Sequence, residues 1–283
     1  MWIAVTGGNG NLGRQVRKEL EDHGHTVFSI GRGAALFRGQ KHRRGDVLDP
    51  GFLVWALRDA EAIVHLAAIP NPFYEPPERI MAVNAQGTYN VLEAAARNQV
   101  RKVVLASSDS VFGYNFRTVA IPAQYLPVDE AHPCYAHDAY GLSKLVAEDL
   151  CEAFTRRTKV PTIALRICSI RYEESREQYA KDLELENPIP VLDGLLAYVD
   201  ARDAARAFRL ALETEGVEHA RLYIAARDLF TKESTLSFLK RRHAQLAPLA
   251  EKLDTYQSVF DTSRASQVIG FKAEFSWRDY FNA

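Results

Sequence analysis

The amino-acid sequence predicts an α/β fold: a doubly wound parallel sheet with a small, interleaved C-terminal part. Short apolar runs alternate with amphipathic helical patterns through the first half of the chain, which is the order typical of a parallel sheet. These runs are apolar throughout, as strands covered on both faces are. The stretch TGGNGNLG, residues 6–13, places four glycines directly after the first run. A tight turn is therefore expected between the first strand and the first helix.

The expected strands and helices alternate along the chain. Leu12, Val16 and Leu20 are spaced four residues apart and so share one face of the first helix. The other helices are assigned from similar apolar patterns, and each strand is a short apolar run. Strands are expected at residues 2–5, 25–30, 62–69, 102–108, 161–167 and 221–226, and helices at 11–24, 49–60, 78–99, 138–157 and 200–214.

Two later regions depart from this alternation. Residues 171–188 are charged and lack apolar periodicity, so a solvated helix or loop is expected there. Residues 227–283 indicate helices and loops with little strand.

The composition excludes several classes of protein. Of 283 residues, 47% are hydrophobic and 25% charged, and the net charge is −1, so neither nucleic acid nor an anionic membrane is an expected partner. No apolar run approaches the roughly 18–20 residues of a transmembrane helix, and no signal peptide is expected from MWIAV. Cys134, Cys151 and Cys168 form no CxxC pair, which favours reduced thiols in a cytoplasmic protein. The histidines show no metal-ligand spacing.

The glycines of residues 6–13 predict a dinucleotide-binding turn. Gly8, Gly10 and Gly13 satisfy GxGxxG, and Gly7, Gly10 and Gly13 satisfy GxxGxxG. The first glycine makes the tight turn, the second lets a pyrophosphate approach the backbone, and the third lets the helix pack closely on the strand. The helix N-terminus then presents free N–H groups and the positive end of its dipole to the phosphates. The alternative, a plain structural turn, is disfavoured by the strand–turn–helix context.

The end of the second strand indicates which cofactor is preferred. NAD-binding versions of this turn carry an acidic residue about twenty positions on, whereas this chain has Gly31 and Arg32 there. Arginine can hold a 2′-phosphate by a bidentate contact, so NADP is favoured while NAD stays possible. A solvated basic loop is the alternative for most of the nearby cations. Asp46, in GDVLD after the next strand, is expected to bond the adenine amine.

The stretch YGLSK predicts a site of proton transfer. Tyr140 and Lys144 lie four residues apart in an expected helix and so share a face. An ammonium group favours phenolate, so we expect Lys144 to lower the pKa of Tyr140 from about 10, which suits a proton donor or acceptor. Ser107 and Ser108 close an expected strand, at the end where open α/β sheets bind ligands. A surface pair is the alternative for the Tyr–Lys spacing.

Together these motifs resemble the extended short-chain dehydrogenase/reductases, the NAD-dependent epimerase/dehydratase family, over nearly the whole chain. TGGNGNLG resembles the family's TGGxGxxG, SSDSVFG its SSxxVYG and YGLSK its YxxSK. GDVLD resembles its adenine-contacting loop, and HLAA the segment behind the pyrophosphate. VNAQGTYNVLEAA resembles its NxxGTxNxLEAA helix, and YVDARDAARA its YVDDxAxA element. The resemblance implies a Rossmann fold.

The resemblance also implies roles for individual residues. Ser108 would hydrogen-bond the reacting oxygen, Tyr140 would be the acid/base, and Lys144 would assist it and hold the nicotinamide ribose. Hydride would pass between a nicotinamide cofactor and a hydroxyl or keto carbon. The expected cofactor contacts are Gly7, Gly10, Asn11, Leu12, Gly13, Arg32, Asp46, Val47, Leu66, Ala67, Ala68, Asn84, Tyr140 and Lys144; the expected substrate contacts are Ser108, Asp109 and Ser169, and no metal is expected.

Departures from the family pattern bear on the substrate. Phe112 replaces the tyrosine of VYG, and Ser169 stands where many nucleotide-sugar enzymes have asparagine in RxxNxYGP. The segment 166–198 is short and lacks the basic, glycine-rich run that would grip a nucleotide diphosphate. Asp109 has no following glutamate, which disfavours elimination of water. Loops such as IPNPFYEPPE are expected to supply most of the pocket.

The sequence therefore predicts an NAD(P)-dependent oxidoreductase or epimerase acting on a sugar or other small polar substrate. The alternatives are a nucleotide-sugar 4-epimerase and, in another class, a non-catalytic NADP-sensing regulator. Residues 1–168 are expected to form the dinucleotide-binding domain, with 198–226 returning to it; residues 169–197 and 227–283 are expected to form the small substrate-binding part. The helices around residues 83–97 and 140–157 resemble the family's dimer interface, so a homodimer is expected.

Overall fold

The computed structural model describes residues 1–116, 123–175, 177, 181 and 195–281. Within these residues the main sheet has seven parallel strands in the order β3–β2–β1–β4–β5–β6–β9. The predicted doubly wound parallel sheet is therefore confirmed. The strands are β1 (Trp2–Thr6), β2 (Thr26–Gly31), β3 (His42–Arg44), β4 (Ala62–His65), β5 (Lys102–Ser108), β6 (Thr162–Ile167) and β9 (His219–Ile224).

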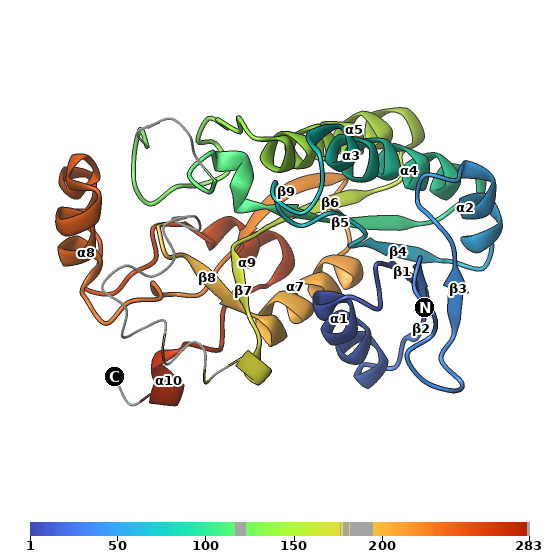
Figure 1. The fold of residues 1–283 in the computed structure, drawn as a ribbon, viewed down its shortest axis with the longest axis horizontal. Helices are drawn as coiled ribbons and strands as arrows, with labels where there is room; N and C mark the ends of the chain where they lie inside the picture. The colour runs from blue at the N-terminus through green and yellow to red at the C-terminus, as the bar shows by residue number, and fades with distance from the viewer. Residues whose placement is uncertain (117–122, 176, 178–180, 182–194, 282–283) are drawn as a thin grey trace.

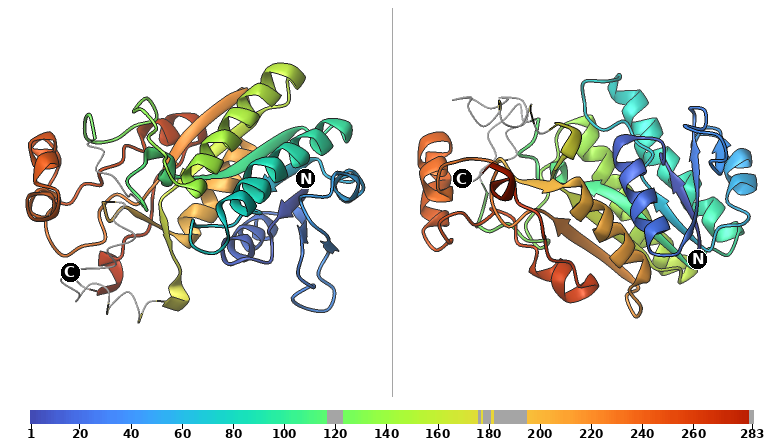
Figure 2. Two further views of the ribbon diagram at one scale, coloured as in Figure 1. Left: turned by 45° about the horizontal axis from the view of Figure 1, so that its top comes forward. Right: turned by 90° about the horizontal axis from the view of Figure 1, so that it is seen from below.

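Helices cover both faces of the sheet (Figure 1). One face carries α1 (Asn11–Asp22), α7 (Ala201–Glu213) and α9 (Ser263–Ile269), and the other carries α2 (Pro50–Ala56), α4 (Gly87–Arg97) and α5 (Ala139–Thr158). In Figure 2, α1 and α7 lie side by side beneath the sheet. Because β9 pairs with β6 and α7 packs against α1, the segment from 198 onward contributes to the same sheet and helix layer as the N-terminal half.

Side chains alternate along the strands and so fill two cores. Ile3 and Val5 of β1 point to the α1/α7 side, whereas Ala4 points to the α2/α4/α5 side. All three are fully buried, as is expected of a parallel sheet with helices on both faces. This double burial explains why the strands are apolar at every position.

The order of the strands places a crevice at the carboxyl ends of the central strands. The chain proceeds from β1 outward to β2 and β3, and then returns to β4 on the other side of β1. Where the order reverses, the connections after β1 and β4 diverge, and open α/β sheets bind their ligands at that point. The glycine turn follows β1 there.

Two elements differ from their predicted bounds for identifiable reasons. The strand expected at 62–69 ends at His65, because the Ala67 N–H donates to the side-chain hydroxyl of Thr6, at 3.2 Å, and so does not continue the backbone ladder with β1. The helix expected at 78–99 is divided into α3 (Pro77–Met81), a π-helical turn (Ala82–Gln86) and α4. The remaining helix and strand boundaries lie within a few residues of their predicted positions, and β3 precedes Asp46 as expected.

A smaller part lies at the other end of the molecule from the N-terminus (Figure 1). It includes a short parallel pair that the sequence did not predict, β7 (Ser169–Arg171) and β8 (Tyr198–Asp200). Helices α8 (Thr235–Arg242) and α10 (Arg278–Phe281) follow it, with 3₁₀ turns at Glu173–Ser175 and Ala244–Ala250. The rest of the solvated segment expected up to residue 188 lies outside the described residues, apart from 177 and 181.

The smaller part has a hydrophobic core of its own. This core joins the turn after β5 to the C-terminal segments and includes Phe112, Tyr223, Leu229, Phe238, Leu246 and Phe260. The Tyr198 hydroxyl donates to Asp228 at 2.7 Å, and the Trp277 N–H donates to Tyr198 at 2.9 Å. These bonds hold the C-terminal segment beside β8, so the smaller part forms one wall of the crevice.

Candidate active site

The turn after β1 has positions that only glycine fits. Gly7 has a φ of +69°, in the left-handed region that favours glycine, and a Cβ there would lie 2.8 Å from the Ala67 nitrogen. A Cβ on Gly13 would lie 2.3 Å from the Gly7 carbonyl oxygen, well inside van der Waals contact. The glycines therefore let β1, the loop after β4 and the start of α1 meet closely.

The N-terminus of α1 is left free for an anion. Gly10 is the N-cap and supplies no side chain to the first backbone N–H groups, which in any helix lack intrahelical acceptors. Gly10, Asn11, Leu12 and Gly13 all line the pocket. Because the positive end of the helix dipole favours a phosphate there, these residues fit the pyrophosphate of a dinucleotide.

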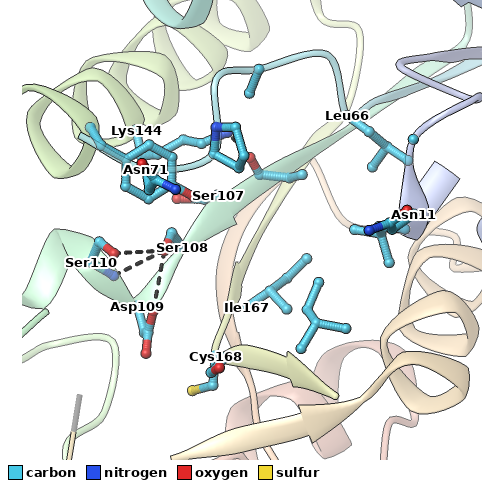
Figure 3. A pocket seen from close by; sticks show the side chains of 18 of the residues that line it. Asn11, Leu66, Asn71, Ser107, Ser108, Asp109, Ser110, Lys144, Ile167 and Cys168 are labelled. Carbon is cyan, nitrogen blue, oxygen red and sulfur yellow. Dashed lines mark hydrogen bonds between the residues drawn. The ribbon is translucent and has the colours of Figure 1, made fainter. Parts of the chain in front are cut away.

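A pocket of about 540 Å³ runs from this turn to the end of β5, a size typical of small-molecule sites. Figure 3 shows Asn11 and Leu66 on one side of the opening, and Ser108 and Asp109 on the other. The predicted site residues that line this pocket are Gly7, Gly10, Asn11, Leu12, Gly13, Leu66, Ala67, Ala68, Ser108, Asp109, Tyr140, Lys144 and Ser169.

Ser108, Tyr140 and Lys144 meet at the pocket wall. Ser108 ends β5, and the other two lie in the first turns of α5. The carboxylate of Asp138 caps α5 by accepting the Tyr140 N–H at 2.8 Å, which fixes where the helix begins. The Lys144 ammonium donates to the Ala106 carbonyl oxygen at 2.8 Å. All three of these pocket side chains are buried.

Burial dominates the titration of Tyr140 and Lys144. The pKa of Lys144 falls to about 8 because desolvation penalises its charge, although Glu148 opposes the shift. The pKa of Tyr140 is raised, chiefly by burial and further by nearby carboxylates, while the Ser108 interaction opposes this. The expectation that Lys144 lowers the Tyr140 pKa is therefore wrong for the protein alone. In this environment Tyr140 is a protonated phenol at neutral pH.

Asn84 stands behind the pocket. Its side chain accepts the Ile69 N–H at 2.8 Å, and donates to the Ile69 carbonyl at 3.0 Å and to the Ser143 hydroxyl at 2.9 Å. These bonds tie the loop after β4 to the helix that carries Tyr140 and Lys144. Both amide hydrogens are thus used within the protein, so Asn84 is a positioning residue whose place depends on the π-helical turn, a distortion frequent at functional sites.

The other three predicted cofactor contacts also lie outside the pocket lining. Arg32 is exposed just after β2, and its carbonyl accepts from the Arg44 Nε at 3.0 Å. Asp46 follows β3, with its carboxylate 3.9 Å from Arg79. Val47 is buried against α4. Arg32 and Asp46 nevertheless stand at the carboxyl ends of β2 and β3, on the side of the sheet where the glycine turn lies.

The substrate side of the pocket contains residues that the motifs did not single out. Asn71, Asn115 and Phe116 line it, and the Asn115 amide donates to Asp109 at 2.9 Å. Asn71 belongs to the loop IPNPFYEPPE, which was expected to shape the pocket. Asn115 and Phe116 follow SSDSVFG by only two and three residues, and that proximity is the one sign of them in the sequence.

A buried charge cluster lies beside Lys144 on α5. Glu148 and Arg166 are almost fully buried and share hydrogen bonds of 3.0 and 2.9 Å. The Ser107 hydroxyl donates to Glu148 at 2.5 Å. Sequence reasoning missed Glu148, although it lies four residues after Lys144 and eight after Tyr140, on the same face of α5.

The one histidine at the end of β4 takes a packing role. His65 bonds the Thr6 hydroxyl at 2.6 Å and the Thr88 hydroxyl at 3.0 Å, and burial lowers its pKa to about 3. In the described part of the chain, no group of three or more His, Cys, Asp or Glu could hold a metal ion. None of the helices among the described residues has the length and apolar character needed to cross a membrane.

The fold and the site together define a class of nicotinamide-dependent enzyme, and comparison with known proteins names the family. The profile of the NAD dependent epimerase/dehydratase family matches residues 3–226. The chain belongs to this family, and it is an NAD-dependent enzyme of the extended short-chain dehydrogenase/reductase type.

The relatives include sugar dehydrogenases and nucleotide-sugar epimerases. L-arabinose 1-dehydrogenase (NAD(P)(+)) of Haloferax volcanii is 33% identical over 179 residues, 58% of this chain and 65% of that one. Uronate dehydrogenase of Pseudomonas syringae pv. tomato is 28% identical over 170 residues, 59% of this chain and 58% of that one. Human UDP-glucose 4-epimerase is 28% identical over 255 residues, 80% of this chain and 70% of that one.

Solved structures share the fold. A short-chain dehydrogenase/reductase superfamily protein from Agrobacterium tumefaciens with bound NAD has a TM-score of 0.74 at 23% identity, covering 100% of this chain and 95% of that one. UDP-glucose 4-epimerase from Thermotoga maritima with UDP-glucose also has a TM-score of 0.74, at 21% identity, covering 100% and 99%. At these identities the likeness establishes the fold alone.

Proposed function

We propose that this enzyme is a dehydrogenase of a small sugar that carries no nucleotide. The observation that carries the proposal is the pocket itself. It joins the glycine turn to Ser108 and Tyr140. Its far side combines polar side chains, such as Asp109 and Asn115, with aromatic and aliphatic ones, such as Phe116, Tyr172 and Ile170. This combination suits a small, hydroxylated substrate held beside a dinucleotide.

The residues at the wall have complementary tasks. A nicotinamide cofactor, when bound, supplies the acceptor or donor of hydride. The Ser108 hydroxyl holds the reacting oxygen by a hydrogen bond. As a phenol, Tyr140 gives its proton to the oxygen of a carbonyl that is reduced. In the oxidation of a hydroxyl, Tyr140 starts as the phenolate and takes the hydroxyl proton. The Lys144 ammonium, which donates to the Ala106 carbonyl, would bind ribose hydroxyls and stabilise the charge of a phenolate.

Two observations favour a free sugar over a nucleotide sugar. Ser169 lines the pocket where many nucleotide-sugar enzymes have asparagine, and serine offers one hydroxyl in place of a bidentate amide. Two relatives are named for dehydrogenation of L-arabinose and of uronates. The competing candidate, a nucleotide-sugar 4-epimerase, is favoured by the longer stretch of similarity to human UDP-glucose 4-epimerase.

Titration with UDP distinguishes these two functions. We expect UDP to leave the oxidation of a free aldose unchanged and to give no heat of binding with the cofactor-loaded enzyme. UDP that binds and competes with the sugar would favour the epimerase, because a nucleotide subsite would then exist beside the reacting carbon.

We also propose that NADP(H) is preferred over NAD(H). Gly31 ends β2 without a side chain, and Arg32 and Arg44 stand next to it on adjacent strand ends. Two guanidinium groups at this edge suit a dianionic 2′-phosphate. The family is described as NAD-dependent, and L-arabinose 1-dehydrogenase of Haloferax volcanii is named for both NAD and NADP.

The assembly that we propose is a homodimer through α4 and α5. Tyr89 on α4 and Leu142 on α5 expose 46% and 42% of their surface, and large apolar side chains on neighbouring helices mark an interaction surface. Closed twofold dimers are the commonest soluble assembly. Light scattering at micromolar concentration is expected to give twice 31.8 kDa, and the monomer mass would contradict the proposal. The three free cysteines support a cytoplasmic location.

A further inference from the structure

We propose that Asp109 determines specificity by binding the hydroxyl on the carbon next to the reacting one, so that the substrate is a vicinal diol or an α-hydroxy carbonyl compound. The inference rests on the proposed dehydrogenase function. It adds a specificity-determining residue to the residues proposed for proton and hydride transfer.

The distance between two side chains carries the proposal. Ser108, which holds the reacting oxygen, lies with its Oγ 3.2 Å from the Asp109 Oδ1. Both residues line the pocket, and Figure 3 shows them side by side. Oxygens on neighbouring carbons of a gauche diol are also about one hydrogen-bond length apart. A substrate whose reacting oxygen meets Ser108 therefore brings its next hydroxyl to Asp109.

The Asp109 carboxylate has acceptor capacity left for such a hydroxyl. Its Oδ1 accepts from Ser108 at 3.2 Å and from Asn115 at 2.9 Å. A carboxylate has about four lone-pair sites. The further neighbours that bond it are the Ser110 N–H, which also donates to the Ser108 hydroxyl at 3.1 Å, and the Cys168 thiol, which is a weak donor. A hydroxyl from the substrate would complete the set of donors.

The burial of the Asp109 carboxylate strengthens its hydrogen bond with a substrate hydroxyl. Only 4% of Asp109 is exposed, and desolvation raises its pKa to about 6 despite the bonds from Asn115 and Ser108. A buried carboxylate that is mostly ionised at neutral pH, and that has only a thiol as one of its donors, binds an added hydroxyl strongly, because bonds to charged groups are among the stronger hydrogen bonds. The same charge disfavours an apolar group at that carbon.

The ring of Phe116 completes the subsite. Phe116 lines the pocket and packs edge-on against Tyr140, with centroids 6.2 Å apart. Its φ of +55° is uncommon for a bulky residue, and such backbone strain gathers at ligand sites. An aromatic face and a carboxylate in one pocket match the two kinds of surface that a sugar presents, its C–H face and its hydroxyls.

A comparison of two substrates in two variants tests the proposal. For an aldose oxidised at C1, the neighbouring hydroxyl is the one on C2. The best aldose of a panel of L-arabinose, D-galactose and D-glucose is compared with its 2-deoxy counterpart, for the wild type and for Asp109→Ala. We expect kcat/KM of the wild type to favour the aldose about ten- to hundredfold, the size of a bond to a charged group. In Asp109→Ala the preference is expected to fall below about threefold, since the neutral pocket no longer distinguishes the two sugars.

Matched variants keep the outcome interpretable. Asp22→Ala makes the same change on an exposed position of α1 and is expected to keep the full preference. Asp109→Asn keeps an acceptor and is expected to lie between wild type and Asp109→Ala, so it serves if the alanine variant does not fold. Equal use of both sugars by the wild type, or full preference in Asp109→Ala, overturns the proposal.

The failure of the proposed function would look different. In that case the wild type oxidises none of the aldoses with either cofactor. Calorimetric titration of aldose and 2-deoxy aldose into the cofactor-loaded protein then decides the role of Asp109. Tighter binding of the aldose that disappears in Asp109→Ala supports it, and equal or absent binding of the two sugars rejects it.

Discussion

The two sides of the pocket differ in the atoms from which they are made. On the cofactor side, the glycine turn and the loop after β4 present backbone, with Gly7, Gly10 and Gly13 leaving space that a Cβ would fill or narrow. On the substrate side, Ser108 and Asp109 present side-chain oxygens held by a local hydrogen-bond network. The first side depends on the absence of side chains, and the second on their identity.

This difference explains how one family can act on different substrates. A surface of backbone N–H groups recognises the phosphates that every dinucleotide shares. The residues of this turn can therefore change little, because larger side chains would alter its shape. Side chains on loops can be exchanged while the sheet stays the same.

The largest effect is expected from Tyr140→Phe on the substrate side. The change removes the proton-transferring oxygen and keeps the ring, so turnover should fall by about 10²–10⁴, the usual contribution of a general acid or base. Steady-state rates measure this loss, and a fluorescence titration should find the reduced cofactor bound with nearly its normal affinity. Turnover close to that of the wild type would refute the assignment of Tyr140.

A single methyl group should disrupt the cofactor side. In Gly13→Ala the new Cβ would lie 2.3 Å from the Gly7 carbonyl oxygen, so the turn must open. We expect a loss of about 3 kcal/mol in the free energy of unfolding, at the upper end of overpacking effects, together with weaker cofactor binding.

Gly33→Ala is the matched control for this change. No atom lies within 4 Å of a Cβ built at Gly33, so denaturant unfolding and cofactor titration should both stay near the wild type. Equal behaviour of Gly13→Ala and Gly33→Ala would mean that the close approach at the turn is unimportant.

The preference between cofactors should change by a smaller factor. Arg32→Ala removes one charge-assisted contact worth about 1.5–3 kcal/mol, so a ten- to hundredfold preference for NADP(H) over NAD(H) should disappear. Calorimetric titration of both cofactors measures it. Equal or tighter binding of NAD(H) by the wild type would show that this edge of the sheet does not hold a 2′-phosphate.

The smallest effect concerns stability and pH. Burial raises the pKa of Asp109 to about 6, above the value of about 3.9 in an unfolded chain, so the ionised carboxylate destabilises the folded state. The contribution of the protonated Asp109 to the free energy of unfolding is therefore fully present below about pH 4 and is lost as the pH rises through 6. Asp109→Asn should gain about 1–2 kcal/mol at pH 8, less than two pKa units imply, because the amide bonds its neighbours less well.

Thermal unfolding at two pH values checks this prediction. The gain in Asp109→Asn should vanish at pH 4, where the wild-type carboxyl is already protonated in the folded protein. A gain of the same size at both pH values would point to packing and away from the buried charge.

The two sides also differ in how far they could be predicted from the sequence. The glycine turn is visible because only one residue type fits it, and Tyr140 and Lys144 are visible because helical spacing sets their shared face. Asn84 was predicted to contact the cofactor. In the structure its side chain bonds the Ile69 backbone and the Ser143 hydroxyl. These bonds depend on the π-helical turn that carries Asn84, which the helical spacing in the sequence does not reveal.

The remaining features depend on contacts between segments far apart in the chain. Glu148 meets Arg166 only because α5 crosses β6. The direction of the Tyr140 pKa shift follows from burial, which the spacing of Tyr140 and Lys144 does not reveal. The pair β7 and β8 is three residues long on each side, too short for a period-2 pattern to be recognised.

The most direct test of the proposed chemistry is to follow the reduced cofactor while a free aldose is consumed. A dehydrogenase leaves the hydride on the cofactor, so we expect one reduced cofactor to accumulate for each sugar oxidised, and none with Tyr140→Phe on the same time scale. An epimerase returns the hydride to its substrate. Formation of an epimer without net reduction of the cofactor would contradict the account.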